Sequence, residues 1–140
     1  IPSGNAIMMG NLWQLGWVWD EADYRNRAQD MLHKMKPALM RYPSAFGQWL
    51  VEAGAMEYGL GELAVIGEGA RDVAHACLRE PLLHRMVLVS DGGAVNGVPL
   101  LADKEAPEQG VKLYWCQDYQ CQRPVQTIEA LRQLIEVDES

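Results

Sequence analysis

The chain has 140 residues, of which 49% are hydrophobic and 22% are charged, so it is long and apolar enough to bury a globular core. Its net charge of −7 at pH 7 argues against nucleic-acid and anionic-membrane partners, because both bind basic surfaces, and no apolar run is as long as a membrane span. Three cysteines are too few for a disulfide scaffold, so we expect reduced thiols and a cytoplasmic protein.

The first sixty residues predict three helices of alternating character. The first, over residues 6–15, is apolar on nearly every side and therefore needs burial all round. The second, over 21–36, is amphipathic, with Asp20 as its N-cap and Pro37 at its end. The third, over 44–58, is again mostly apolar. This alternation is typical of an α/α toroid, in which outer helices cover apolar inner ones.

Beyond Leu60, short apolar runs alternate with helical patterns, which favours a small parallel or mixed sheet. We expect strands near 62–67, 86–91 and 111–117, and helices near 70–80 and 127–137. The predicted fold class is therefore α+β. Residues 1–59 are expected to be a helical hairpin segment from an α/α toroid, and residues 60–140 a small three-stranded α/β layer.

Six residues at the starts of the two apolar helices are the best candidates for a binding site. Hydroxyl and amide groups suit the hydroxyls of a sugar-like ligand, and a tryptophan ring offers a stacking face. The candidate cavity-lining residues are Ser3, Gly4, Asn5, Ser44, Gln48 and Trp49. The alternative interpretation is that the serines and asparagine are ordinary helix caps and that the tryptophan belongs to the core.

Cys116 and Cys121 are separated by four residues, and reduced structural thiols are the favoured interpretation. A redox-labile pair and half of a zinc site are the alternatives, but neither His75 nor His84 has the spacing of a second ligand pair, so no metal site is predicted. Cys77 is expected to be buried within a helix.

Two further motifs predict turns rather than sites. Gly67 and Gly69 follow a strand, but the dinucleotide-binding pattern needs a third glycine where Asp72 stands. Ser90, Asp91 and His84 flank the second strand, but Ser90 and Asp91 precede two glycines, which is ordinary turn chemistry and not part of a catalytic triad.

The stretches PSGNA, YRNRAQDML, RYPSAFGQWL, ELAVIG and YWCQDYQCQRPVQTIEAL, in this order, resemble the C-terminal part of another group of proteins. These are the thioredoxin-domain-containing, YyaL-type proteins, which are related to the spermatogenesis-associated protein family. The similarity runs along nearly all of the chain.

The resemblance implies an architecture more firmly than a reaction, because the family has no established activity. The family's architecture has three parts in order. These are a thioredoxin-like domain, a six-hairpin α/α toroid like those of glycosidases and sugar epimerases, and a small α/β segment. This chain would hold the last toroid helices and that segment. Ser3, Gly4 and Asn5 match the PSGN motif on the cavity side, and Cys116 and Cys121 match cysteines that precede a proline.

We therefore expect a C-terminal domain of a larger cytoplasmic protein, the parent protein, that contributes one wall of a carbohydrate-type cavity. The chain starts near an apolar helix, which we interpret as the mark of a fragment whose neighbouring helices are missing. It would hold no complete catalytic site and no cofactor. Its partners would be the rest of the parent protein, or a second copy that covers exposed faces of Met8, Met9, Trp13 and Trp49.

Two alternatives stay open. In the first, the parent protein is a sugar-acting enzyme of the epimerase or glycosidase kind, with Glu52 or Glu57 of the third helix as an acid/base group. In the second, the α/β segment is a redox-responsive protein-interaction module whose redox pair is Cys116 and Cys121.

Overall fold

The computed structural model describes residues 3–81 and 84–138, and it confirms the α+β class. Its contacts divide the chain into two compact units, Ile1–Gly59 and Leu60–Ser140, called below the helical unit and the sheet unit. Within the described ranges, no helix is long and apolar enough to cross a membrane.

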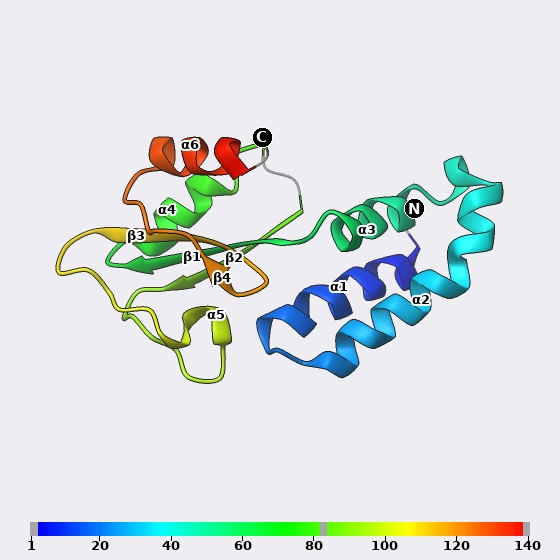
Figure 1. Cartoon of the computed structure of the whole chain (residues 1–140), viewed down its shortest axis with the longest axis horizontal. Coiled ribbons are helices and arrows are strands. Elements are labelled where there is room, and N and C mark those ends of the chain that lie inside the picture. Colours follow the sequence, from blue (N-terminus) through cyan, green and yellow to red (C-terminus); the bar gives the residue numbers. More distant parts are fainter. Residues whose placement is uncertain (1–2, 82–83, 139–140) are drawn as a thin grey trace. The chain divides into compact units, whose positions relative to one another are not determined.

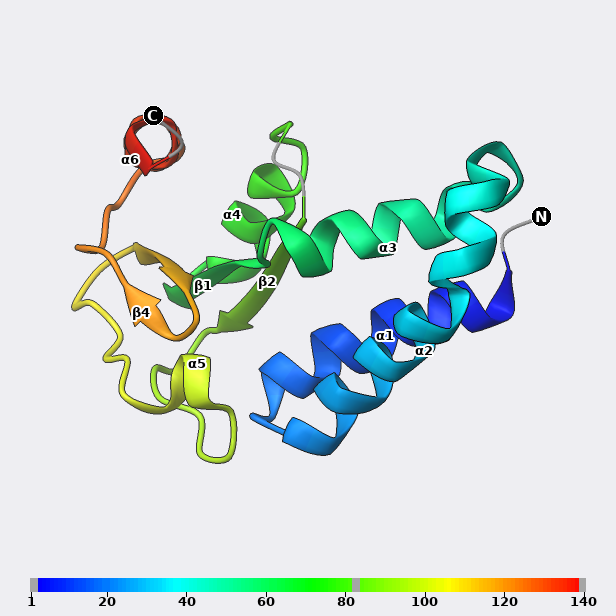
Figure 2. The ribbon, with the colours of Figure 1, turned by 45° about the vertical axis from the view of Figure 1, so that its right-hand side comes forward.

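The helical unit consists of α1 (Gly4–Val18), α2 (Ala22–Arg41), the 3-10 turn η1 (Pro43–Ala45) and α3 (Gly47–Glu57). Figures 1 and 2 show α1 and α2 as an antiparallel hairpin, with α3 running back along it. As a result, the amino ends of α1 and α3 lie at the same end of this unit.

The hairpin is held by Arg25, and this contact changes both predicted helix boundaries. The Arg25 guanidinium donates to the carbonyl oxygen of Gly16, forms a 3.0 Å ion pair with Asp20 and lies over the Trp17 ring. Because Gly16 has no side chain, Arg25 packs directly on it, and α1 continues to Val18 instead of ending before that glycine. Asp20 is therefore an ion-pair partner in the turn and not the N-cap of α2.

Helix α2 runs through Pro37 and ends at Arg41, so the predicted end at Lys36 is wrong. Proline removes one backbone hydrogen bond, which normally ends a helix. Here the extra turn buries Leu39 in the core of the unit, and this burial offsets the loss.

The core of the helical unit is formed by apolar side chains from all three helices: Ala6, Met9, Trp13, Ala28, Leu39 and Trp49. Met9, Trp13 and Trp49 were expected to be exposed and to meet a second copy. This prediction is wrong for these three residues, because their side chains are at most 8% exposed, whereas Met8 is 52% exposed. Apolarity on all sides of a helix does not reveal which side packs first.

The sheet unit contains a four-stranded mixed sheet in the order β2-β1-β3-β4. Strand β1 pairs in parallel with β2 and antiparallel with β3, which pairs antiparallel with β4. The elements are β1 (Gly61–Gly67), α4 (Ala70–Cys77), β2 (Arg85–Ser90), α5 (Pro99–Ala102), β3 (Val111–Gln117), β4 (Gln120–Cys121) and α6 (Ile128–Asp138). The expectation of three strands missed β4, and α5 was also missed, because neither is long enough to show a periodic pattern.

The two faces of the sheet have different neighbours. On one face, α4 and α6 pack on the strands through Leu63, Val65 and Leu113, while Arg132 of α6 donates to Glu80 just beyond α4 at 2.8 Å. Figures 1 and 2 show the short helix α5 on the other side. The register aligns one row of residues across all four strands on that side: Met86, Glu62, Cys116 and Cys121.

The end of β1 depends on a glycine, and this dependence is testable by substitution. Gly67 has φ +123°, and a Cβ atom there would lie 2.2 Å from the carbonyl oxygen of Gly110. Gly67→Ala should therefore lower the free energy of unfolding by at least about 2 kcal/mol.

Gly92→Ala is the control, because a Cβ at Gly92 meets no heavy atom within 4 Å, and this variant should change the free energy by less than about 0.5 kcal/mol. Urea unfolding of both variants measures the difference. Equal stability of the two variants would contradict the contact at Gly67.

Candidate functional site

The amino ends of α1 and α3 carry the polar residues that the sequence singled out. Ser3, Gly4 and Asn5 are exposed, and so is Ser44 in η1. Ser3 is the N-cap residue of α1, but its side chain makes no capping hydrogen bond, so ordinary capping does not account for its hydroxyl group. The structure brings these two groups of residues to the same end of the helical unit (Figure 2).

Gln48 and Trp49 do not join that polar surface. The Gln48 side-chain amide donates to Glu52 at 2.6 Å, one turn further along α3. Trp49 is 5% exposed and packs in the core, so its ring is not available as a stacking face for a ligand. The sequence showed that an amide and an aromatic ring lie near the start of α3. It did not show that Gln48 binds Glu52 and that Trp49 packs in the core.

Glu52 lies at the contact between α3 and α1. Its carboxylate sits against Gly10, where a Cβ atom would lie 2.3 Å from Oε2. Together with the bond from Gln48, this contact holds a half-buried carboxylate between two apolar helices. Gly10 was missed by sequence reasoning, because a glycine within a helical pattern does not show what packs on it.

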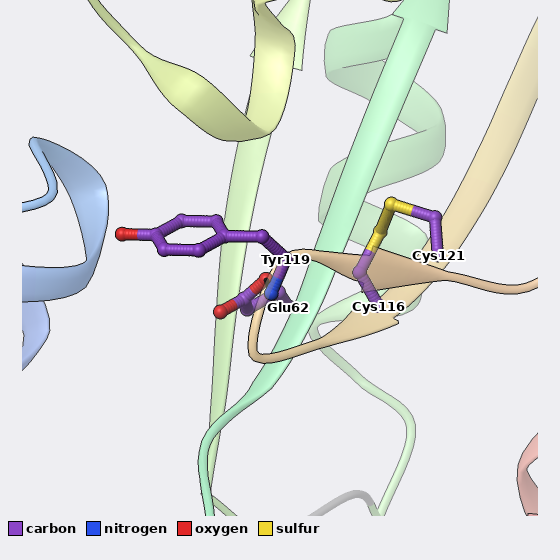
Figure 3. The surroundings of a disulfide bond; sticks show 4 residues. All are labelled: Glu62, Cys116, Tyr119 and Cys121. Carbon is purple, nitrogen blue, oxygen red and sulfur yellow. Dashed lines mark hydrogen bonds between the residues drawn. A yellow bond between two sulfur atoms is a disulfide. The ribbon is translucent and has the colours of Figure 1, made fainter.

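In the sheet unit, Cys116 and Cys121 form a disulfide bond, with Cα atoms 3.9 Å apart. The favoured interpretation of reduced thiols is therefore wrong for this pair, whereas Cys77 is free and buried as expected. The two bonded cysteines differ in environment: Cys116 is 1% exposed, while Cys121 is exposed. Figure 3 shows the bond joining the two strands of the β3–β4 hairpin.

The hairpin needs the disulfide only in part. Its turn consists of Asp118 and Tyr119, both with positive φ, as in the type I′ turns that match the twist of paired strands. The covalent loop is short, and on the chain-entropy model a loop of this length contributes roughly 2 kcal/mol of stability. Residues Trp115–Asp118 and Gln120–Gln122 line a surface depression of about 380 Å³ around the bond.

Glu62 is the buried acid of the sheet unit, and sequence reasoning missed it. It is 1% exposed, and its Oε2 accepts a hydrogen bond from the Tyr119 backbone N–H at 3.2 Å (Figure 3). Burial raises the pKa of Glu62 to about 7; Asp118 also raises it, while the Tyr119 bond and Lys104 lower it. The available signal was a carboxylate at the start of an otherwise apolar strand, ELAVIG.

The remaining motifs have structural roles in the described residues. The Ser90 hydroxyl donates to the carbonyl oxygen of Gly93, as turn chemistry predicts. Gly69 is the N-cap of α4 in a left-handed conformation. Across the described ranges, no group of three or more His, Cys, Asp or Glu side chains is placed to hold a metal ion.

Comparison of the chain with protein-family models, curated protein sequences and solved structures found no match. The two candidate sites, the helix amino ends and the disulfide hairpin, are therefore interpreted from their own residues.

The raised pKa of Glu62 predicts a pH dependence of stability. An unfolded glutamate loses its proton near pH 4.5, whereas folded Glu62 keeps its proton until about pH 7. Between these values the folded state binds more protons, so stability falls as pH rises and levels off above pH 7. For this one group, the fall amounts to about 3 kcal/mol.

Glu62→Gln should remove this component, because an amide does not titrate and its oxygen still accepts the Tyr119 bond. Urea unfolding from pH 4.5 to 8 should then show a difference between wild type and variant that grows with pH. Glu68→Gln, at an exposed position, is the control. A pH-independent difference for Glu62→Gln would contradict the buried, neutral carboxyl group.

Proposed function

We propose that this chain is the C-terminal domain of a larger, cytoplasmic, thioredoxin-domain-containing protein, in which its helical unit completes an α/α toroid. The observation that carries the proposal is that α1 has two apolar sides. One side packs in the core through Ala6, Met9 and Trp13. The second side leaves Met8, Leu15 and Trp19 exposed.

The second side has the spacing of a helix-packing surface. Met8, Leu15 and Trp19 follow one another at intervals of seven and four residues, which places them on one side of a helix. α3 also exposes Leu50 and Val51, whereas the solvent side of α2 is charged. Further inner helices of the parent protein, packed beside α1 and α3, are the occupant that fits this arrangement.

The shared amino end of α1 and α3 would then face the toroid cavity. Exposed Ser3, Asn5 and Ser44 supply hydroxyl and amide groups there, which suit the hydroxyl groups of a carbohydrate-type ligand. This end of the helical unit would form one wall of the cavity and would hold no complete catalytic site by itself.

The proposal predicts that a charge on the second side of α1 is harmless in this chain alone but harmful in the parent protein. Met8→Lys should lower the free energy of unfolding of the parent protein by at least about 2 kcal/mol, because it buries an unpaired charge. In this chain alone the change should stay within about 0.5 kcal/mol.

Met40→Lys is the matched control, since Met40 is 77% exposed on the outer helix α2. The parent protein is first identified by its mass in native cells, with an antibody raised against this chain. A native species of about 15.7 kDa, or a parent protein that tolerates Met8→Lys, would overturn the proposal.

A second candidate function is a sugar-acting enzyme, epimerase- or glycosidase-like, and the placement of Glu52 favours it. An acid/base group must be held in position and partly shielded from water. Glu52 meets both conditions through Gln48 and Gly10. Glu57 does not, because it is exposed and borders a depression that is shared with α2.

In the parent protein, Glu52→Gln should lower kcat/KM for hexose epimerisation or hexoside hydrolysis by at least about 100-fold. Glu57→Gln is the control and should leave the activity unchanged. Circular dichroism and thermal unfolding establish that both variants are folded. Full activity of Glu52→Gln would exclude Glu52 as the acid/base group.

A further inference from the structure

We propose that the Cys116–Cys121 disulfide is a site of thiol–disulfide exchange, attacked by an external thiolate at Cys121, with Cys116 as the leaving sulfur. This inference stands on the sheet unit alone and does not depend on the toroid proposal. The partner is identified by its chemistry: a dithiol, either a small molecule or a protein.

The first observation is the asymmetry of the bond. Thiol–disulfide exchange requires the attacking sulfur to approach along the S–S axis, so the accessible sulfur is the one attacked. Cys121 is exposed and lies in the surface depression of about 380 Å³, whereas Cys116 is 1% exposed. The structure therefore separates the attacked sulfur from the leaving sulfur.

The second observation is the position of Glu62. Strand register places Glu62 directly opposite Cys116 on β1, and Cys121 directly opposite Cys116 on β4. Directly opposed residues project from the same face, with Cβ atoms about 5 Å apart. The carboxyl group itself points to the hairpin turn, where it accepts the Tyr119 N–H, and not to the S–S bond (Figure 3). This hydrogen bond therefore ties the turn to β1 independently of the disulfide.

The reaction balances with these groups and one dithiol. The external thiolate forms a bond to Cys121 Sγ, the S–S bond breaks, and its electron pair stays on Cys116 Sγ. The Cys116 thiolate then takes up a proton from solvent. The second thiol of the reagent then attacks the mixed disulfide, which oxidises the reagent to its disulfide and leaves Cys121 reduced.

The third observation is that backbone hydrogen bonds also hold the fold around the bond. Leu113 and Val125 exchange two backbone hydrogen bonds of 2.7 and 3.0 Å beyond the hairpin, and the Gln122 N–H donates to the Trp115 carbonyl at 2.9 Å. Strand β3 is also paired along its length with β1. Opening the bond therefore does not require the sheet to unfold.

The first test is reduction of the full chain by dithiothreitol under native conditions, followed by alkylation and mass spectrometry. The expected result is a rate proportional to the concentration of dithiothreitol and well above the rate of global unfolding. A rate that is independent of dithiothreitol and equal to the unfolding rate would overturn the proposal.

The second test distinguishes the two sulfurs with glutathione disulfide. Cys121 in the Cys116→Ser variant should form the mixed disulfide at least about 100-fold faster than Cys116 in the Cys121→Ser variant, because only the first thiol is accessible. Equal rates would overturn attack at Cys121. The dithiothreitol test on the wild-type chain decides the matter if either variant fails to fold.

Discussion

The pairing register of β1 with β3 is the constraint on which the sheet unit depends. It aligns Glu62 with Cys116 and, through the β3–β4 hairpin, with Cys121. A slip of one residue would turn Cys116 to the face that α4 and α6 cover and would leave Glu62 without the Tyr119 N–H. The apolar residues Leu63, Val65 and Leu113 fix this register, because they must meet α4 and α6.

In the helical unit, the packing depends on two glycines of α1 that let side chains of the neighbouring helices approach its backbone closely. Gly10 lets the Glu52 carboxylate lie on α1, and Gly16 lets Arg25 reach the backbone at the other end of the same helix. Both glycines face the helices that this chain supplies. The second side of α1 differs, because it carries large apolar residues that are exposed, such as Met8 and Trp19.

The strands could be predicted from the sequence, because apolar runs with clear ends define them. The buried side of α1 could not, because this helix is apolar on every side. The strands are apolar runs bounded by glycine or turn residues, so the α+β class followed from them. α1 is apolar all round, so its sequence did not reveal that Met9 and Trp13 face the core while Met8 does not. The disulfide was only an alternative to reduced thiols, because a spacing of four residues fits both. Glu62 was missed because one acid in a strand becomes significant only when the register shows its neighbours.

The sheet separates the free thiol of Cys77 from the Cys116–Cys121 disulfide. Cys77 is buried with Leu63 and Leu113 on the face of the sheet that carries α4 and α6, whereas Cys116 projects from the other face. Burial also raises the pKa of the Cys77 thiol and so suppresses its reactive thiolate form. The sheet therefore stands as a barrier between the free thiol and the bond. Cys77 is therefore separated from the bond in the folded chain, and a thiol that exchanges with the Cys116–Cys121 pair would have to come from outside.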